Sequence, residues 1–147
     1  MLSEAGCPGV ADPGAEIAKL AHEKGIEVIP LVGPSSILLA LMASGMNGQS
    51  FVFHGYLSPK KELIGKDLKR LEQMAQKHKQ TQLFIETPYR NRQLVEQAFK
   101  SLSSKTRFCI AMDLTLPNQY VVTKTIGEWR KTKLPELHKR PAVFLLQ

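Results

Sequence analysis

The chain has 147 residues, of which 43% are hydrophobic and 22% charged, and its formal net charge is +7. This is an ordinary globular composition of a length that suits one domain, with no apolar run near the roughly 18 residues of a membrane span and no signal-peptide pattern. Two cysteines and four histidines without ligand spacing argue against a disulfide framework or a metal site, so we expect a cytoplasmic protein that holds no metal and contacts no membrane.

The first third of the chain contains two loops rich in glycine and proline, residues 3–14 (SEAGCPGVADPG) and 30–36 (PLVGPSS). Each is expected to lead into a helix, at 13–24 with Asp12 as N-cap and at 35–44, with a short strand at 26–31 between them. The second helix is apolar nearly all round, which predicts that it is buried. Glycine allows close backbone approach and proline fixes a turn, so two such loops are typical of the rim of a small-molecule site. A tight strand-to-helix turn is the simpler explanation.

After a turn at 45–48, the pattern predicts alternating strands and helices. The helix at 60–79 is expected to direct Leu63, Leu68 and Leu71 toward a core. The strands at 107–112 and 119–124 are expected to pair as neighbours. The other elements are strands at 51–56, 81–86 and 142–146 and helices at 88–102 and 125–131. This order predicts an α/β fold, with a mixed sheet and helices on its faces.

The charge is unevenly distributed between these two parts. Residues 1–50 carry two lysines and five acidic residues, a balance of −3, whereas residues 51–147 carry 18 basic and eight acidic residues, a balance of +10. A solvated lysine-rich surface explains such a balance, and so does a surface that binds a polyanion such as RNA. The change near residue 50 favours two modules with different roles.

Four blocks of the sequence, in the right order, resemble the tetrapyrrole (corrin/porphyrin) methylase superfamily. Residues 3–14 are similar to its SDAGTPGISDPG signature, and residues 28–45 (VIPLVGPSSILLALMASG) are similar to its VVPIPGPSALLAALSASG block. Residues 51–61 (FVFHGYLSPKK) and 83–90 (LFIETPYR) resemble the blocks F.F.GFLP.K and LVFYESPHR. The closest branch is that of ribosomal RNA small subunit methyltransferase I.

The resemblance implies a tetrapyrrole-methylase-like fold and a division of the chain into domains. Residues 1–48 correspond to the C-terminal part of an N-terminal α/β domain, and residues 49–147 to a C-terminal basic α/β domain. In the family, a first strand and a Gly-rich loop precede the part that matches residue 1. We therefore expect this chain to be a fragment that is inactive alone.

The resemblance also implies the cofactor S-adenosylmethionine and a set of residues around it. The turn with Cys7 and Val10 meets the methionine part, although Cys7 stands where the family usually has threonine or aspartate. The strand end that resembles the family's ARELTK packs on the adenine. The implied cofactor-binding residues are Cys7, Val10, Ser35, Ser36, Glu86, Ala111, Met112, Pro141 and Ala142.

Each of these residues also has a plainer structural interpretation. Ser35 and Ser36 are good caps for the second helix. Met112 is equally suited to a core. Glu86 is a negative charge near a helix N-terminus, where the helix dipole stabilises it. Pro141 and Ala142 are suited to an edge turn before the last strand.

No residue is identified as the catalytic base. Glu86, Asp113 and Lys60 are the polar candidates, and Tyr89 stands where the family usually has histidine. For RNA, the candidates are basic residues of the first helix after residue 50, where spacings of three and four put several on one face. They are Lys60, Lys61, Lys66, Lys69 and Arg70, and a solvated helix face is the alternative.

The function implied is that of a methyltransferase that uses S-adenosylmethionine, acts on a cytidine ribose 2′-oxygen in small-subunit ribosomal RNA, and is a homodimer. One alternative is methylation of a tetrapyrrole precursor. The net charge of +10 on residues 51–147 is less suited to that substrate than to RNA. Another is a non-catalytic RNA-binding module. The two glycine- and proline-rich loops argue against that module, because electrostatic binding does not require them.

Overall fold

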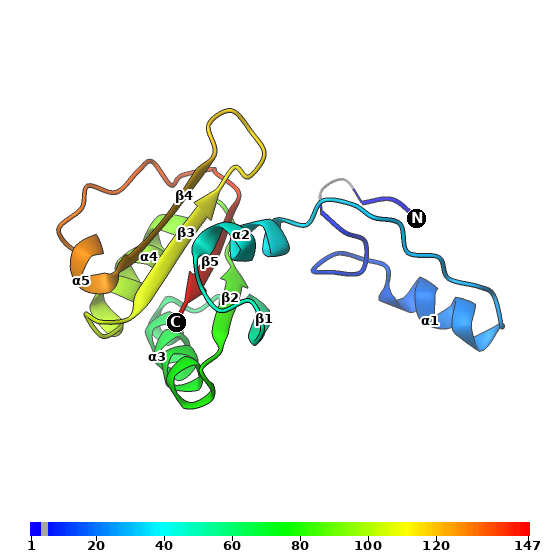
Figure 1. The fold of residues 1–147 in the computed structure, drawn as a ribbon, viewed down its shortest axis with the longest axis horizontal. Helices are drawn as coiled ribbons and strands as arrows, with labels where there is room; N and C mark the ends of the chain where they lie inside the picture. Colours follow the sequence, from blue (N-terminus) through cyan, green and yellow to red (C-terminus); the bar gives the residue numbers. More distant parts are fainter. Residues whose placement is uncertain (4–5) are drawn as a thin grey trace. The chain divides into compact units, whose positions relative to one another are not determined.

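The fold comes from a computed structural model that describes residues 1–3 and 6–147 (Figure 1). The chain divides into two compact units, residues 1–36 and residues 37–147. Two positions of the first glycine- and proline-rich loop, Glu4 and Ala5, lie outside the described residues. The domain boundary after residue 48 stays a prediction.

Among the described residues of the first unit, the helix is α1 (Ala15–Glu23), close to the predicted range. Its N-cap is Gly14 rather than the expected Asp12, and no side chain caps the helix. Gly14 has a φ of +151°, and a Cβ there would lie 3.0 Å from the backbone nitrogen of Gly9. Glycine is therefore required where the loop closes onto the helix. At the other end, Gly25 follows the helix with a φ of +66° as expected.

The prediction of a strand at residues 26–31 is wrong. This segment has an irregular backbone, and within the described part of the first unit no strand lies beside it. A strand needs a neighbour for its backbone hydrogen bonds, so an apolar run alone does not make one. Several of its large side chains, including Ile29 and Leu31, are exposed.

The second unit is built on a five-stranded mixed sheet with the order β1-β2-β5-β3-β4. β1 and β2 are parallel, and the other neighbours are antiparallel. The expected pairing of the fourth strand with the third is confirmed. The strands are β1 (Phe51–Tyr56), β2 (Thr81–Ile85), β3 (Arg107–Met112), β4 (Tyr120–Thr125) and β5 (Ala142–Leu146).

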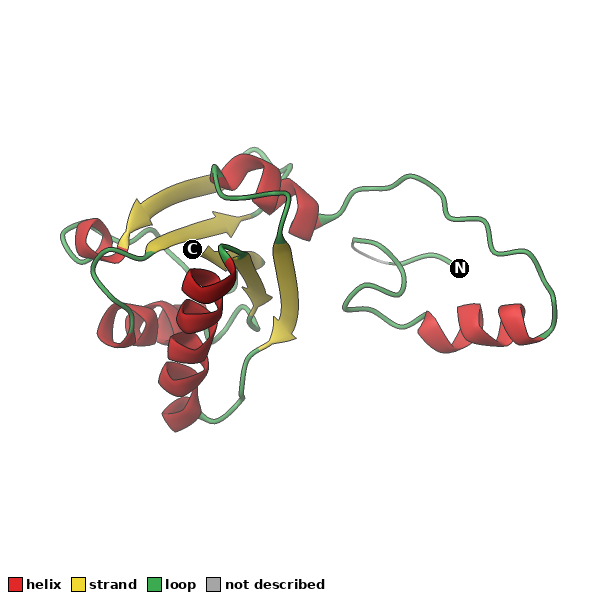
Figure 2. Cartoon of the chain, turned by 60° about the horizontal axis from the view of Figure 1, so that its bottom comes forward, coloured by secondary structure: helices red, strands yellow, loops and turns green. Residues whose placement is uncertain are grey.

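Helices cover both faces of this sheet (Figures 1 and 2). One face packs against α3 (Lys61–His78), α4 (Asn91–Ser101) and the short α5 (Ile126–Trp129), and the other packs against α2 (Ser36–Ser44). The alternation of side chains along each strand produces this division. In β3, Phe108 and Ile110 face α3 and α4, while Cys109 and Ala111 belong to the cluster under α2.

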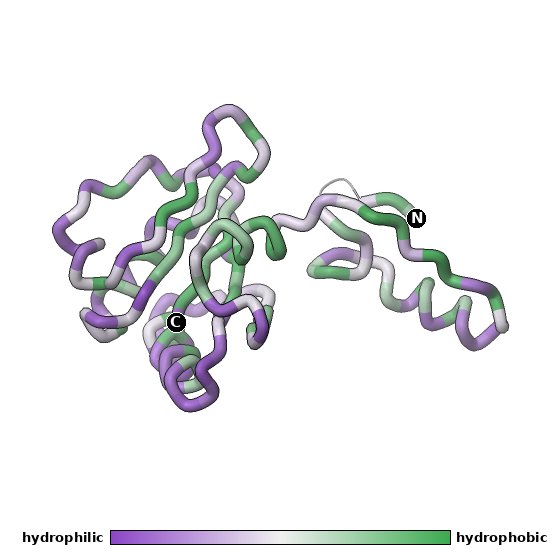
Figure 3. Tube along the Cα trace, viewed as in Figure 1, coloured by the Kyte–Doolittle hydropathy of each residue, from purple (hydrophilic) through white to green (hydrophobic). Residues whose placement is uncertain are grey.

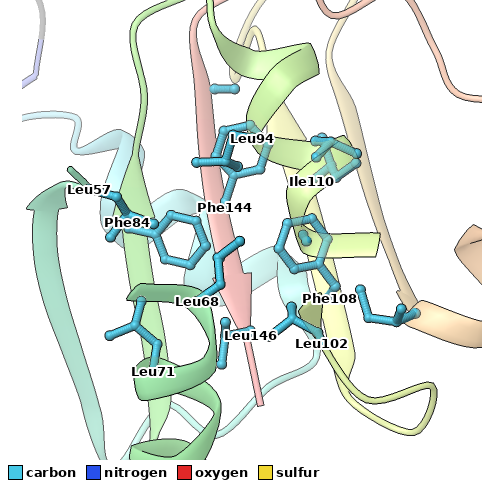
Figure 4. Close-up of a cluster of buried hydrophobic side chains, with 14 of the residues drawn as sticks. Leu57, Leu68, Leu71, Phe84, Leu94, Leu102, Phe108, Ile110, Phe144 and Leu146 are labelled. Carbon is cyan, nitrogen blue, oxygen red and sulfur yellow. The ribbon is translucent and has the colours of Figure 1, made fainter. Parts of the chain in front are cut away.

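The larger core lies between the sheet and the helices α3 and α4 (Figure 4). The rings of Phe84 and Phe108 each lie 6.0 Å from that of Phe144, between their centroids. Leu63, expected in this core, is 38% exposed, and the fully buried Ile64 takes its place. Ile64 lies one helical turn before Leu68 and so shares its face, as the period of 3.6 requires.

The expectation that α2 is buried all round is wrong in part. Its buried residues pack on the sheet, but Leu38 and Met42 are exposed. Figure 3 shows this helix as a continuous hydrophobic stretch. None of the helices in the described ranges has the length and apolar character needed to cross a membrane.

Candidate functional site

Several predicted site residues of the second unit gather at one edge of the sheet. The strands β1, β2 and β3 end there, and β5 begins there, because β5 runs antiparallel to both of its neighbours. Met112 is paired with Ala142, and Ile85, which precedes Glu86, is paired with Val143. Sequence positions far apart are thus adjacent, in the part of an α/β sheet where ligands commonly bind.

Glu86 is a buried carboxylate held by its own turn. Its Oε1 accepts hydrogen bonds from the backbone nitrogen of Thr87 at 2.7 Å and from Arg90 Nη2 at 2.6 Å. Arg90 Nη1 also donates to the carbonyl of Pro59 at 2.9 Å, which ties this turn to the residue before Lys60. The second oxygen, Oε2, is buried and has no hydrogen-bond partner among the described residues. Glu86 therefore combines a fixed position with one free acceptor.

Asn91, at the start of α4, connects the turn at residues 86–91 to residues 137–140 before β5 through hydrogen bonds. Its Nδ2 donates to the carbonyls of Leu137 at 3.3 Å and Arg140 at 2.7 Å. The backbone nitrogen of Lys139 donates to the carbonyl of Pro88 at 3.1 Å. These bonds make residues 86–91 and 137–140 one rigid assembly at the sheet edge.

Asp113 is buried in a second polar cluster. Its Oδ2 accepts from Arg140 Nε and from Asn118 Nδ2, both at 2.6 Å, and its backbone nitrogen donates to the carbonyl of Pro141 at 3.1 Å. Arg140 Nη2 donates to the Asn118 carbonyl at 2.7 Å. Through these bonds, the Asp113 carboxylate holds the loop after β3 next to the residues that precede β5.

Ala111 and Met112 lie on opposite faces of the sheet, both fully buried. Met112 is part of the core under α3 and α4, and Ala111 belongs to the cluster under α2. Of the pair at the start of β5, Pro141 is exposed and Ala142 is buried. Met112 thus presents its backbone, not its side chain, at this edge.

The first unit brings its two glycine- and proline-rich loops together. Cys7 Sγ donates to the carbonyl of Pro34 at 3.3 Å, although 27 positions separate them. Val10 is 48% exposed, Ser35 is half-buried, and Ser36 is exposed. That these residues share one pocket with Glu86, Ala111 and Ala142 stays a prediction.

The basic residues assigned to RNA are all exposed on or beside α3. Three of them, Lys66, Lys69 and Arg70, line a shallow groove of about 480 Å³ together with Leu63, Asp67 and Gln73. They share one helix face, as their spacing predicts. Their contact with RNA stays a prediction.

The buried thiol of Cys109 in β3 and the half-buried phenol of Tyr120 in β4 are not suited to nucleophilic chemistry. Burial raises the pKa of the Cys109 thiol from 9.0 to about 11, an effect that its hydrogen bond with Thr123 partly offsets. Burial, followed by the influence of Cys109, also raises the pKa of Tyr120. Both side chains therefore keep their protons near neutral pH.

Arg90, Asn91 and Asn118 are polar residues of this edge that were not predicted from the sequence, and Arg140 was expected only as part of the turn with Pro141 and Ala142. Arg90 follows Glu86 by four positions across a strand-to-helix turn, a spacing that allows an ion pair. Arg140 directly precedes the predicted Pro141–Ala142 turn. No local signal links Arg140 to Asp113, because 27 positions separate them.

Residues 1–129 match the model of the family Tetrapyrrole (Corrin/Porphyrin) Methylases. This chain belongs to that family. The resemblance of the four sequence blocks is thereby confirmed.

Curated relatives of this family member carry the name ribosomal RNA small subunit methyltransferase I. The Bacillus subtilis protein is 34% identical over 128 residues, which are 87% of this chain and 42% of that protein. The Neisseria meningitidis serogroup B protein is 33% identical, over 86% of this chain and 42% of its own length. The chain therefore spans less than half the length of these relatives.

Solved structures of methyltransferases agree with this chain in fold. The methyltransferase CobJ matches with a TM-score of 0.59 and 20% identity, over 96% of this chain and 61% of its own. Uroporphyrin-III C-methyltransferase from Thermus thermophilus, in complex with S-adenosylhomocysteine, matches with a TM-score of 0.53 and 15% identity, over 96% and 62%. The predicted tetrapyrrole-methylase-like fold is confirmed.

Proposed function

We propose that this chain is part of a methyltransferase that uses S-adenosylmethionine to methylate a cytidine ribose 2′-oxygen in small-subunit ribosomal RNA. The relatives at 30–34% identity that bear an rRNA methyltransferase name carry this proposal. The basic groove on α3 agrees with a polyanionic acceptor. The whole enzyme is proposed to be a cytoplasmic homodimer.

The residues present fit this cofactor in their chemistry. The hydrogen bond from Cys7 to Pro34 joins two loops rich in glycine and proline, and glycine allows the close backbone approach that suits a ligand with an amino acid part. At the sheet edge, Ala111 and Ala142 are small residues that are buried on opposite faces of the sheet. We propose that Cys7, Val10, Ser35 and Ser36 hold the methionine part, and that Ala111, Met112, Pro141 and Ala142 hold the adenine.

The cofactor supplies a methyl group on a sulfonium, which is already a strong electrophile. The protein must orient the ribose hydroxyl and accept its proton. Among the three candidates, Lys60 is exposed, and Glu86 and Asp113 each use one oxygen to bind two donors. Glu86 keeps Oε2 without a partner in the described structure, and so it is our candidate for contact with the acceptor.

Methyl transfer from labelled S-adenosylmethionine tests the proposal. The full-length enzyme that contains this chain should label small-subunit ribosomal RNA, and the labelled position should resist alkaline hydrolysis at the bond after a cytidine, since a 2′-O-methyl group blocks it. Uroporphyrinogen should remain unlabelled. Labelling of the tetrapyrrole alone would overturn the RNA assignment and keep the family chemistry.

A further inference from the structure

An open groove of about 620 Å³ lies between the start of α3, the outer face of α4 and residues 136–138. Lys61, Tyr89, Arg92 and His138 contribute to its lining. Tyr89 is 68% exposed, unlike the aromatic residues of the core. Tyr89 therefore presents a large aromatic ring to solvent in this groove.

The turn that carries Tyr89 is fixed on both sides. The Arg90 nitrogen donates to the Thr87 carbonyl at 2.9 Å, and the Lys139 nitrogen donates to the Pro88 carbonyl at 3.1 Å. The His138 ring lies edge-on to Tyr89, with centroids 5.7 Å apart and an interplanar angle of 71°. The phenol is therefore displayed by a rigid backbone, which lowers the entropy cost of binding.

Two lysines beside Tyr89 are suited to contact the phosphates of a ligand. Lys139 Nζ lies 5.9 Å from the centroid of the Tyr89 ring, and Lys61 lines the groove. Among the described residues, neither lysine forms an ion pair with a carboxylate. Of the two acidic residues of the groove, Glu96 is paired with Arg92 at 3.1 Å, whereas Glu136 accepts a hydrogen bond from the backbone nitrogen of His138 at 2.8 Å and keeps its negative charge.

We propose that this groove binds one unpaired nucleotide of an RNA strand, with its base stacked on Tyr89 and the adjoining phosphates near Lys61 and Lys139. The inference rests on the proposed function, because it concerns how the RNA acceptor is held. Aromatic side chains stack on bases of single strands, whereas the bases of a duplex are not accessible in this way. Tyr89 directly precedes Arg90, the ion-pair partner of Glu86, so the nucleotide would be held by the turn that carries the candidate base, although neither Glu86 nor Arg90 lines the groove.

Binding of a fluorescein-labelled single-stranded RNA of about 12 nucleotides to the 147-residue chain tests this assignment. Tyr89→Leu should weaken binding by about ten-fold or more, and Tyr89→Phe should stay within about two-fold of wild type because the ring remains. The matched control is Tyr56→Leu, which removes another exposed tyrosine of the second unit that does not line the groove. A duplex of the same sequence should bind more weakly and should not respond to Tyr89→Leu.

Photocrosslinking with 5-iodouridine in the same RNA gives a direct readout. The crosslink should appear in the tryptic peptide 80–90, in which Tyr89 is the one tyrosine. Equal affinity of Tyr89→Leu and wild type, or crosslinks to other peptides only, would overturn this inference and leave the proposed methyltransferase standing. If the wild-type chain binds no RNA and the full-length enzyme labels only a tetrapyrrole, the proposed function itself fails.

Discussion

Arg140 Nε lies 2.6 Å from Asp113 Oδ2 and so joins the residue after β3 to the turn before β5. Asp113 has a φ of +47°, a conformation that few residues other than glycine, asparagine and aspartate adopt readily. Both side chains are largely buried. This ion pair therefore fixes the loop at the sheet edge where the adenine is proposed to bind.

Asp113→Asn should lower the free energy of unfolding by about 1–3 kcal/mol, because it leaves the Arg140 guanidinium with a weaker partner in a buried site. Asparagine tolerates the positive φ at this position, so the fall in the free energy of unfolding comes from removing the negative charge. Urea unfolding of Asp113→Asn, Arg140→Gln and the double variant measures the coupling free energy between the two side chains. The exposed Arg92–Glu96 pair is the control, with an expected coupling below about 0.5 kcal/mol. Equal coupling in the two pairs would contradict this account.

Glu86→Gln should affect both stability and activity. The buried pair with Arg90 is weakened, which should cost about 1–3 kcal/mol by urea unfolding. In the full-length enzyme, methyl transfer at saturating substrate should fall at least ten-fold if Oε2 accepts the hydroxyl proton. Asp113→Asn is the comparison, since Asp113 is also a buried carboxylate paired with an arginine. Unchanged turnover and pH profile in Glu86→Gln would remove it as the candidate base.

The two cysteines should differ in reactivity. With its pKa raised by burial to about 11, only about one Cys109 thiol in a thousand is ionised at pH 8. Cys7 is half-buried in a surface loop and should react first with a thiol reagent. Ellman's reagent should therefore titrate one thiol in the native chain and two in urea, and Cys7→Ser should leave none in the native state. A fast second thiol without denaturant would contradict the burial of Cys109.

Replacing Lys66, Lys69 and Arg70 with glutamine should weaken RNA binding and lower its log–log salt dependence by roughly 2–3. These residues line one groove, so their phosphate contacts would be lost together. The matched control replaces three other exposed lysines, Lys100, Lys105 and Lys131, with glutamine. It should lower the log–log salt dependence of RNA binding less. Affinity for S-adenosylmethionine should not change in either variant. Identical slopes in the two triple variants would assign α3 to a solvated surface.

The capping box of α5 predicts a pH dependence. Hydrogen bonds from the backbone and side chain of Thr125 lower the pKa of Glu128. A carboxylate with a lower pKa in the folded state stabilises the fold above its ordinary pKa, and this contribution disappears as the pH falls through the folded value. The Tm of wild type should exceed that of Glu128→Gln at neutral pH, and the difference should narrow in acid. A constant difference would contradict the role of the charge.

Local patterns were sufficient for most elements of the second unit. Strand β3 was predicted at its observed bounds because five apolar residues in succession suit a strand buried on both faces. Helix α3 was predicted from its 3.6-residue period, yet that period permitted a choice between Leu63 and Ile64. The choice depended on where the sheet lies against the helix, which the helix alone does not specify.

Composition, periodicity and the four matched blocks determined the family, the α/β class and the separation of charge along this chain, because each is a property of neighbouring residues. Only the tertiary structure decided that residues 26–31 form no strand, that β5 lies between β2 and β3, and that Arg140 meets Asp113. Strand pairing and buried ion pairs join residues far apart in sequence. Their partners are selected by hydrogen bonding and burial across the whole sheet, and no local pattern carries that information.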